Sequence, residues 1–322
     1  MQRRFYLIVL LAALMLLGGC AQPSPVQTVQ PSPGQPSPGQ PSPGQPSPGQ
    51  PSPAPDDTFT VVTSFYPMYV LTANVVGDAQ GVELVNMAEQ QTGCLHDYQL
   101  LPADMQALER ADVFVINGAG MESFMSRVSE QFADLTVITA SEGVEMIVDA
   151  YGEPNAHVWL DPARAAQQVE RIAAGLAEAD SQRAEIYRQN GAAYAQRLRE
   201  LGGELRAQLA DAPKRDIITF HEAFPYFAEA FDLNIAAVIE REPGSEPTTQ
   251  EIARTVDIVR EAGITALFVE PQYPDRAAET IARETGASLY TLDPIVTGEL
   301  SGDAYEEKMR QNAATLLEAL GS

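Results

Sequence analysis

Histidine and cysteine are scarce in this chain of 322 residues, which contains three histidines, two cysteines and one tryptophan. Two cysteines exclude both a scaffold held by several disulfides and a zinc finger with four cysteine ligands. Basic residues are also few, because 20 Lys and Arg stand against 44 Asp and Glu, for a formal net charge of −24. Nucleic-acid-binding proteins carry basic patches, so this balance argues against nucleic acid as a partner.

Residues 1–19 have the pattern of a bacterial lipoprotein signal peptide. Arg3 and Arg4 precede an apolar run, which ends in the sequence LGGC at Cys20. The run is too short to span a membrane comfortably as a permanent helix. We expect Cys20 to be lipidated and to anchor the mature chain to the membrane outside the cytoplasm. An ordinary signal peptide that happens to end in cysteine is the alternative.

Residues 20–57 have a different composition, with PSPGQ pentads repeated over residues 31–50. A segment so rich in Pro, Ser, Gly and Gln cannot form a core. It predicts a disordered, partly polyproline-II tether between the lipidated Cys20 and a folded body.

From residue 58 onward, β-rich and helix-like stretches alternate, which predicts parallel sheets covered by helices. We expect an N-terminal α/β lobe over 58–180, a long bridging helix over 181–212 and a C-terminal α/β lobe over 213–322. Helices are expected over 122–132 and 222–231, among others. In open α/β sheets ligands bind at the carboxyl ends of the strands, so the cleft between two doubly wound lobes is the expected site.

The three histidines occupy related places in this pattern. His96 lies between a predicted strand and the helix expected at Pro102, His157 lies in the loop that enters the bridging region, and His221 directly follows a predicted strand. Histidines used only for packing have no reason to prefer such junctions. Imidazole is the commonest nitrogen ligand of zinc, so the three together indicate a metal site.

A carboxylate is expected to complete the ligand set. Asp293 is the best match, because it ends a predicted strand of the second lobe as His221 does. A turn or capping role is the alternative for an acid before proline. Glu270 could orient a histidine without binding the metal itself, and Glu222 lies next to His221.

The folded body resembles the metal-binding lipoproteins that serve as substrate-binding proteins of zinc and manganese ABC transporters. The resemblance covers nearly the whole chain from residue 59 onward. The motifs that carry it, in order, are HDY at 96–98, ADVFVING at 111–118, NAHVWLDP at 155–162, FHEAF at 220–224, FVEPQ at 268–272 and LDP at 292–294.

The resemblance implies four metal ligands: His96 and His157 from the first lobe, and His221 and Asp293 from the second. It also implies a long helix between the lobes and delivery of the metal to an ABC permease. The third ligand tends to be His in the family's zinc binders and Glu in its manganese binders, which favours zinc here. Three nitrogens and a carboxylate also suit tetrahedral zinc, whereas manganese prefers oxygen. Manganese stays open as the ion, and we expect a monomer.

Cys94 lies two residues before His96, where the family is expected to have a residue that does not bind metal. It is interpreted either as a small buried residue, or as a supplementary thiolate ligand or redox-sensitive gate beside the metal.

Two other functions remain open. A surface adhesin is compatible with a tethered lipoprotein. A zinc hydrolase would need a coordination position left for water, and the chain has no HExxH pair.

Overall fold

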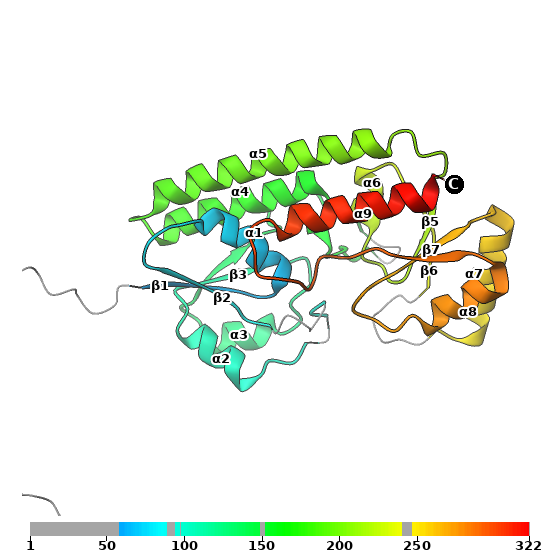
Figure 1. Cartoon of the computed structure of the whole chain (residues 1–322). Helices are drawn as coiled ribbons and strands as arrows, with labels where there is room; N and C mark the ends of the chain where they lie inside the picture. The colour runs from blue at the N-terminus through cyan, green and yellow to red at the C-terminus, as the bar shows by residue number, and fades with distance from the viewer. Residues whose placement is uncertain (1–57, 89–93, 97, 149–151, 240–246, 322) are drawn as a thin grey trace, which may run out of the picture. The chain divides into compact units, whose positions relative to one another are not determined.

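The computed structural model describes residues 58–88, 94–96, 98–148, 152–239 and 247–321. The predicted signal peptide, Cys20 and the tether lie outside these residues. Two lobes follow one another inside a single compact unit, Pro53–Ser322 (Figure 1). No helix in the described part of the chain is both long enough and apolar enough to cross a membrane.

Each lobe contains a four-stranded parallel sheet, and the two sheets have the same topology. The first has the strand order β2-β1-β3-β4 and the second β6-β5-β7-β8. The predicted pair of α/β lobes is thereby confirmed. The strands are β1 (Phe59–Thr63), β2 (Val82–Asn86), β3 (Val113–Ile116), β4 (Thr136–Thr139), β5 (Asp216–Thr219), β6 (Asn234–Val238), β7 (Ala266–Val269) and β8 (Ser288–Thr291).

Helices connect these strands, and local sequence signals define their ends. Asp161 caps α4 by accepting a hydrogen bond from Ala163 N at 2.8 Å, and α7 begins with a capping box and ends at Gly263 with φ 63°. The helices are α1 (Tyr66–Val76), α2 (Pro102–Glu109), α3 (Met125–Gln131), the 3₁₀ helix η1 (Val158–Leu160), α4 (Pro162–Ala179), α5 (Ala184–Leu209), α6 (Pro225–Ala230), α7 (Thr249–Ala262), α8 (Arg276–Thr285) and α9 (Ala304–Leu320).

Helix α5 is the long connection from the first lobe to the second, and it runs side by side with α4 (Figure 1). It spans 26 residues, and its buried residues recur every three or four positions, which gives one apolar stripe. The stripe packs on α4 and also contacts α1 and α9. The bridge is therefore part of the packed core.

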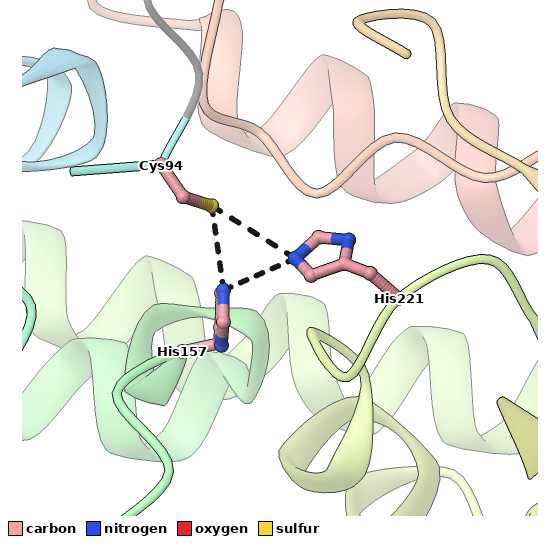
Figure 2. Close-up of side chains that lie close together, drawn as sticks. All are labelled: Cys94, His157 and His221. Carbon is pink, nitrogen blue, oxygen red and sulfur yellow. Dashed lines mark hydrogen bonds between the residues drawn. The ribbon is translucent and has the colours of Figure 1, made fainter. Parts of the chain in front are cut away.

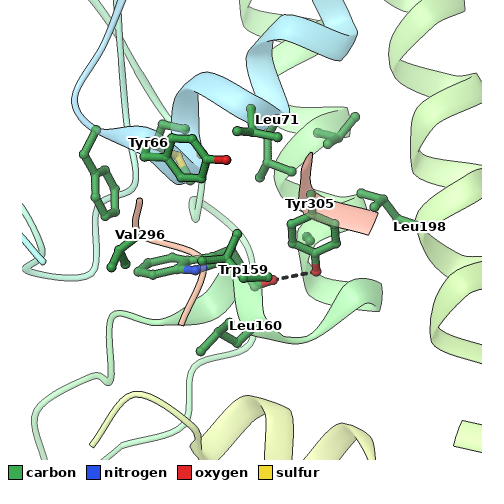
Figure 3. Packing of buried hydrophobic residues seen from close by; sticks show 14 of the residues in the cluster. Tyr66, Leu71, Trp159, Leu160, Leu198, Val296 and Tyr305 are labelled. Atoms are coloured by element: carbon green, nitrogen blue, oxygen red, sulfur yellow. Dashed lines mark hydrogen bonds between the residues drawn. The ribbon is translucent and has the colours of Figure 1, made fainter. Parts of the chain in front are cut away.

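One apolar cluster joins the segment before α4 to the C-terminal part of the chain (Figure 3). Trp159 is fully buried, and its Nε1 donates a hydrogen bond to Pro294 O at 2.9 Å. The Tyr305 hydroxyl donates to Trp159 O at 2.7 Å. Tyr66 of α1 similarly donates to Glu299 O at 2.9 Å. These contacts fix the loops that carry the site described below.

Two helices begin later than the sequence pattern predicts. The helix expected from Glu222 begins at Pro225, because proline suits the first helical turn and disfavours helical backbone in the residue before it. The helix expected from Glu122 begins at Met125. The Glu122 carboxylate instead accepts hydrogen bonds from Ser64 Oγ and from the backbone N–H groups that follow β3.

The close contact between α4 and α5 can be tested at two glycines of α5. A Cβ added at Gly191 would lie 2.4 Å from Ala173 Cβ, whereas a Cβ at Gly203 would meet nothing within 4 Å. We expect Gly191→Ala to lower the free energy of unfolding by about 1–2 kcal/mol, because overpacking outweighs the gain in helix propensity. Gly203→Ala, the matched control, should raise it by roughly 0.5–1 kcal/mol.

Urea denaturation of the metal-free protein measures both values. Equal effects of the two substitutions would contradict the close packing, and adding Ala173→Gly should rescue Gly191→Ala.

Candidate metal centre

The second lobe supplies two groups from neighbouring strands. His221 lies just beyond the end of β5, and Glu270 directly follows β7. In the order β6-β5-β7-β8, the chain reverses its winding between β5 and β7, and this crevice is where open α/β sheets bind ligands. The backbone thus brings both side chains to one edge of the sheet.

His221 and Glu270 form a buried pair. His221 Nδ1 lies 2.5 Å from Glu270 Oε1, and the residues are 1% and 3% exposed. Glu270 Oε1 also accepts from His221 N at 3.3 Å. The carboxylate therefore holds the ring through Nδ1 and leaves Nε2 facing away. This is the orienting role expected for a carboxylate behind a metal-binding histidine.

His157 is held in a comparable way from the loop before η1. Asn155 Oδ1 lies 3.2 Å from His157 Nδ1 and accepts from His157 N at 3.0 Å. Asn155 Nδ2 in turn donates to Glu222 O at 2.8 Å. His157 is 3% exposed, and its Nε2 points toward His221.

The two Nε2 atoms meet each other and the thiol of Cys94 (Figure 2). The two nitrogens are 3.4 Å apart. Cys94 Sγ lies 3.4 Å from the Nε2 of His157 and 3.9 Å from that of His221. Within the described ranges, these three residues form the group of His, Cys, Asp or Glu donors that is compact enough to hold a metal ion. We call it the Cys–His cluster.

His96 and Glu222 lie beside this cluster. The His96 ring centroid is 5.6 Å from that of His157. His96 and Glu222 line a cavity of about 260 Å³ together with His157 and His221. The structure therefore brings the three histidines to one place, with His96 at the cavity wall.

Asp293 is placed differently. Its Oδ1 accepts a hydrogen bond from Ile295 N at 2.8 Å, and its Oδ2 forms an ion pair with Lys308 of α9. The side chain of Asn312 contacts both the N–H and the C=O of Asp293. In this structure the carboxylate closes a turn and binds a lysine, and it is not part of the Cys–His cluster.

Proton affinity is uneven within the cluster. Burial lowers the pKa of His157 well below its usual value, and the neighbouring His221 and His96 lower it further. Burial also lowers the pKa of His221, but Glu270 and Cys94 together outweigh burial and raise the pKa to about 10. In the metal-free protein, the histidine that carries a second ring proton is therefore His221 and not His157.

A family model described as the zinc-uptake complex component A, periplasmic (ZnuA), matches residues 61–319. The chain belongs to this family. It is a metal-binding, extracytoplasmic component of ABC-type metal uptake and not an enzyme, so the zinc-hydrolase alternative is set aside.

Individual relatives carry different names. The manganese-binding lipoprotein MntA of Halalkalibacterium halodurans is 31% identical over 268 residues, which cover 81% of this chain and 88% of that protein. The laminin-binding adhesin Lmb of Streptococcus agalactiae has a TM-score of 0.75 at 26% identity, with coverage of 81% and 99%. FpvC of Pseudomonas aeruginosa in complex with Mn²⁺ has a TM-score of 0.74 at 31% identity, with coverage of 82% and 99%. The predicted family resemblance and fold are confirmed.

Two residues beside the site were not singled out from the sequence. Asn155 precedes His157 by two residues, a spacing at which an amide can reach both the backbone and the ring. Tyr273 belongs to the loop after β7, and its ring lies edge-on against that of His221, with centroids 5.6 Å apart. No local sequence signal links Tyr273 to His221, because the two residues follow different strands.

The His221–Glu270 pair predicts a pH dependence of the metal-free protein. A histidine whose pKa is higher in the folded than in the unfolded chain stabilises the fold fully below the unfolded value of about 6.5. This contribution is lost as pH rises toward the folded value of about 10. Thermal melts between pH 6 and 10 should therefore show falling stability in the wild type and a weaker fall in Glu270→Gln.

Glu261 is an exposed residue of α7, so Glu261→Gln is the charge-matched control and should behave as the wild type. Identical profiles for the wild type and Glu270→Gln would contradict the ion pair.

Proposed function

We propose that this protein captures one divalent transition-metal ion, with zinc favoured, and delivers it to an ABC permease for uptake. The observation that carries the proposal is the pair of buried imidazoles with Nε2 atoms 3.4 Å apart. Each ring is held through Nδ1 by a protein oxygen. Each therefore offers an unprotonated Nε2 once His221 has lost its second ring proton.

His96, His157 and His221 are the proposed nitrogen ligands. His96 is included because its ring shares the cavity wall with the other two. Asp293 would have to leave Lys308 and the Ile295 N–H to act as the fourth ligand.

Zinc is favoured over manganese by the donors. Imidazole nitrogen suits zinc, copper and nickel, whereas manganese prefers carboxylate, carbonyl and water oxygen. Relatives do not decide between the ions, since the family description names zinc while MntA is named for manganese and FpvC was solved with Mn²⁺. The donor set of this chain is therefore the stronger guide.

Capture and release follow from the construction of the site. Metal binding displaces the proton from His221, and Glu270 then balances part of the charge of the ion. Because α5 and the hydrogen bond from Trp159 to Pro294 O hold the lobes together, we expect small movements of the loops instead of wide closure. Lipidated Cys20 would keep the monomeric protein at the membrane beside its permease.

A second candidate function is adhesion, which the structural similarity to the adhesin Lmb favours. Adhesion would use the outer surface, so it is separable from the metal site. Substitutions of the three histidines should leave laminin binding unchanged if the protein is an adhesin in addition.

Zinc titration of His96→Ala, His157→Ala and His221→Ala tests the proposed uptake function. Loss of a group that orients a metal ligand costs roughly 10–100-fold in metal affinity. Loss of a ligand itself should therefore cost about 100-fold or more. The increase in melting temperature caused by zinc should shrink in parallel. Glu261→Gln serves again as the control and should bind as the wild type does. Full-affinity binding by any one histidine variant would refute the role of that residue.

A further inference from the structure

We infer that the fourth ligand is the thiolate of Cys94, so that the metal is held by one sulfur and three imidazole nitrogens. In this arrangement Asp293 is a structural residue of the C-terminal lobe. The inference rests on the proposed metal capture and specifies which donors perform it. When the ion binds, the thiol proton of Cys94 is released to solvent and the sulfur forms the bond to the metal.

The distances within the Cys–His cluster fit one face of a zinc tetrahedron. With zinc–nitrogen bonds of about 2.1 Å and a zinc–sulfur bond of about 2.3 Å, tetrahedral angles place two nitrogens about 3.4 Å apart and nitrogen and sulfur about 3.6 Å apart. The two Nε2 atoms are 3.4 Å apart. Sulfur lies 3.4 and 3.9 Å from them, which brackets the ideal value. One ion can therefore reach all three atoms without a rearrangement of the backbone.

The alternative fourth ligand is already engaged. Both oxygens of the Asp293 carboxylate have partners, namely Ile295 N and the Lys308 ammonium. Asn312 additionally fixes the Asp293 backbone from α9. Recruiting Asp293 would leave Lys308 without its ion-pair partner and open the turn. Recruiting Cys94 requires the loss of one proton.

Tyr273 lies beside the Cys–His cluster from the second lobe. Burial and the nearby Cys94 raise the pKa of its hydroxyl, which therefore stays protonated and can act as a hydrogen-bond donor. The Tyr273 ring packs edge-on against His221, with centroids 5.6 Å apart, and stacks on Phe220 at 6.3 Å. Tyr273 is thus assigned as a positioning residue, because its ring contacts a nitrogen ligand of the second lobe and its protonated hydroxyl is a donor near Cys94.

The sulfur ligand has a consequence for selectivity. Thiolate is a soft donor that favours zinc and disfavours manganese, which prefers hard oxygen ligands. A site with one sulfur and three nitrogens should discriminate against manganese more strongly than a site with a carboxylate in the fourth position. Cys94 is therefore the specificity-determining residue of the site.

Cobalt(II) substitution provides the test, with cobalt alone as the spectroscopic probe. The full chain carries Cys20→Ala, so that Cys94 is its one thiol. We expect a sulfur-to-cobalt charge-transfer band in the near ultraviolet. The band should vanish in Cys94→Ser and persist in Asp293→Asn. Zinc affinity, measured by competition with a chelator, should fall about 100-fold in Cys94→Ser, and the preference for zinc over manganese should fall with it.

Tyr273→Phe keeps the ligand and removes only its hydrogen-bond donor. We expect a shift in the energy of the charge-transfer band and a loss of zinc affinity of about 10-fold. Circular dichroism of the metal-free variants establishes that each one is folded. An unshifted band in Tyr273→Phe would refute the role assigned to Tyr273.

The possible failures are distinguishable. If the starting protein binds no zinc, the proposed function itself is wrong. If it binds zinc without a sulfur-to-cobalt band, or if Cys94→Ser keeps full zinc affinity while His157→Ala loses it, the metal site stands and the sulfur ligand is refuted. A loss in Asp293→Asn as large as in the histidine variants would restore Asp293 as the fourth ligand.

Discussion

The site depends on one constraint, which is that two buried imidazole rings present their Nε2 atoms to each other at 3.4 Å. Two imidazolium ions could not share this space, because the charges would repel in a buried setting. The protein avoids this repulsion by surrounding the two rings differently. Glu270 lies behind His221 and Asn155 lies behind His157, so one ring has a charged partner and the other a neutral one. A divalent cation between the rings satisfies both.

The fold supplies this arrangement by joining two copies of one topology. The same parallel strand order occurs in both lobes, and His221 and Glu270 come from the ends of the two strands at the winding reversal of the second sheet. His157 and Cys94 come from loops of the first lobe. The lobes share packing through α5 and through the Trp159 hydrogen bond to Pro294 O. A site made from both lobes is therefore held in register before the metal arrives.

Much of this was predictable from the sequence, and the reason differs from residue to residue. Helix α7 was predictable at both ends, because the Thr248–Glu251 capping box and Gly263 are local signals. His221 was predictable as a candidate because it follows a strand, and strand ends are where such folds bind ligands. The ion pair of Asp293 was not, since it depends on Lys308, which lies fifteen residues further on in α9. The contact between Cys94 and His221 likewise depends on how two lobes meet, which no short-range pattern records.

The most direct test of the account is X-ray absorption spectroscopy at the zinc edge of the zinc-loaded, full-length protein carrying Cys20→Ala. We expect a four-coordinate ion with three imidazole nitrogens at about 2.0–2.1 Å and one sulfur at about 2.3 Å. A shell without sulfur, with imidazole and carboxylate oxygen in its place, would contradict the sulfur ligand. A shell of oxygen alone would contradict the site as a whole.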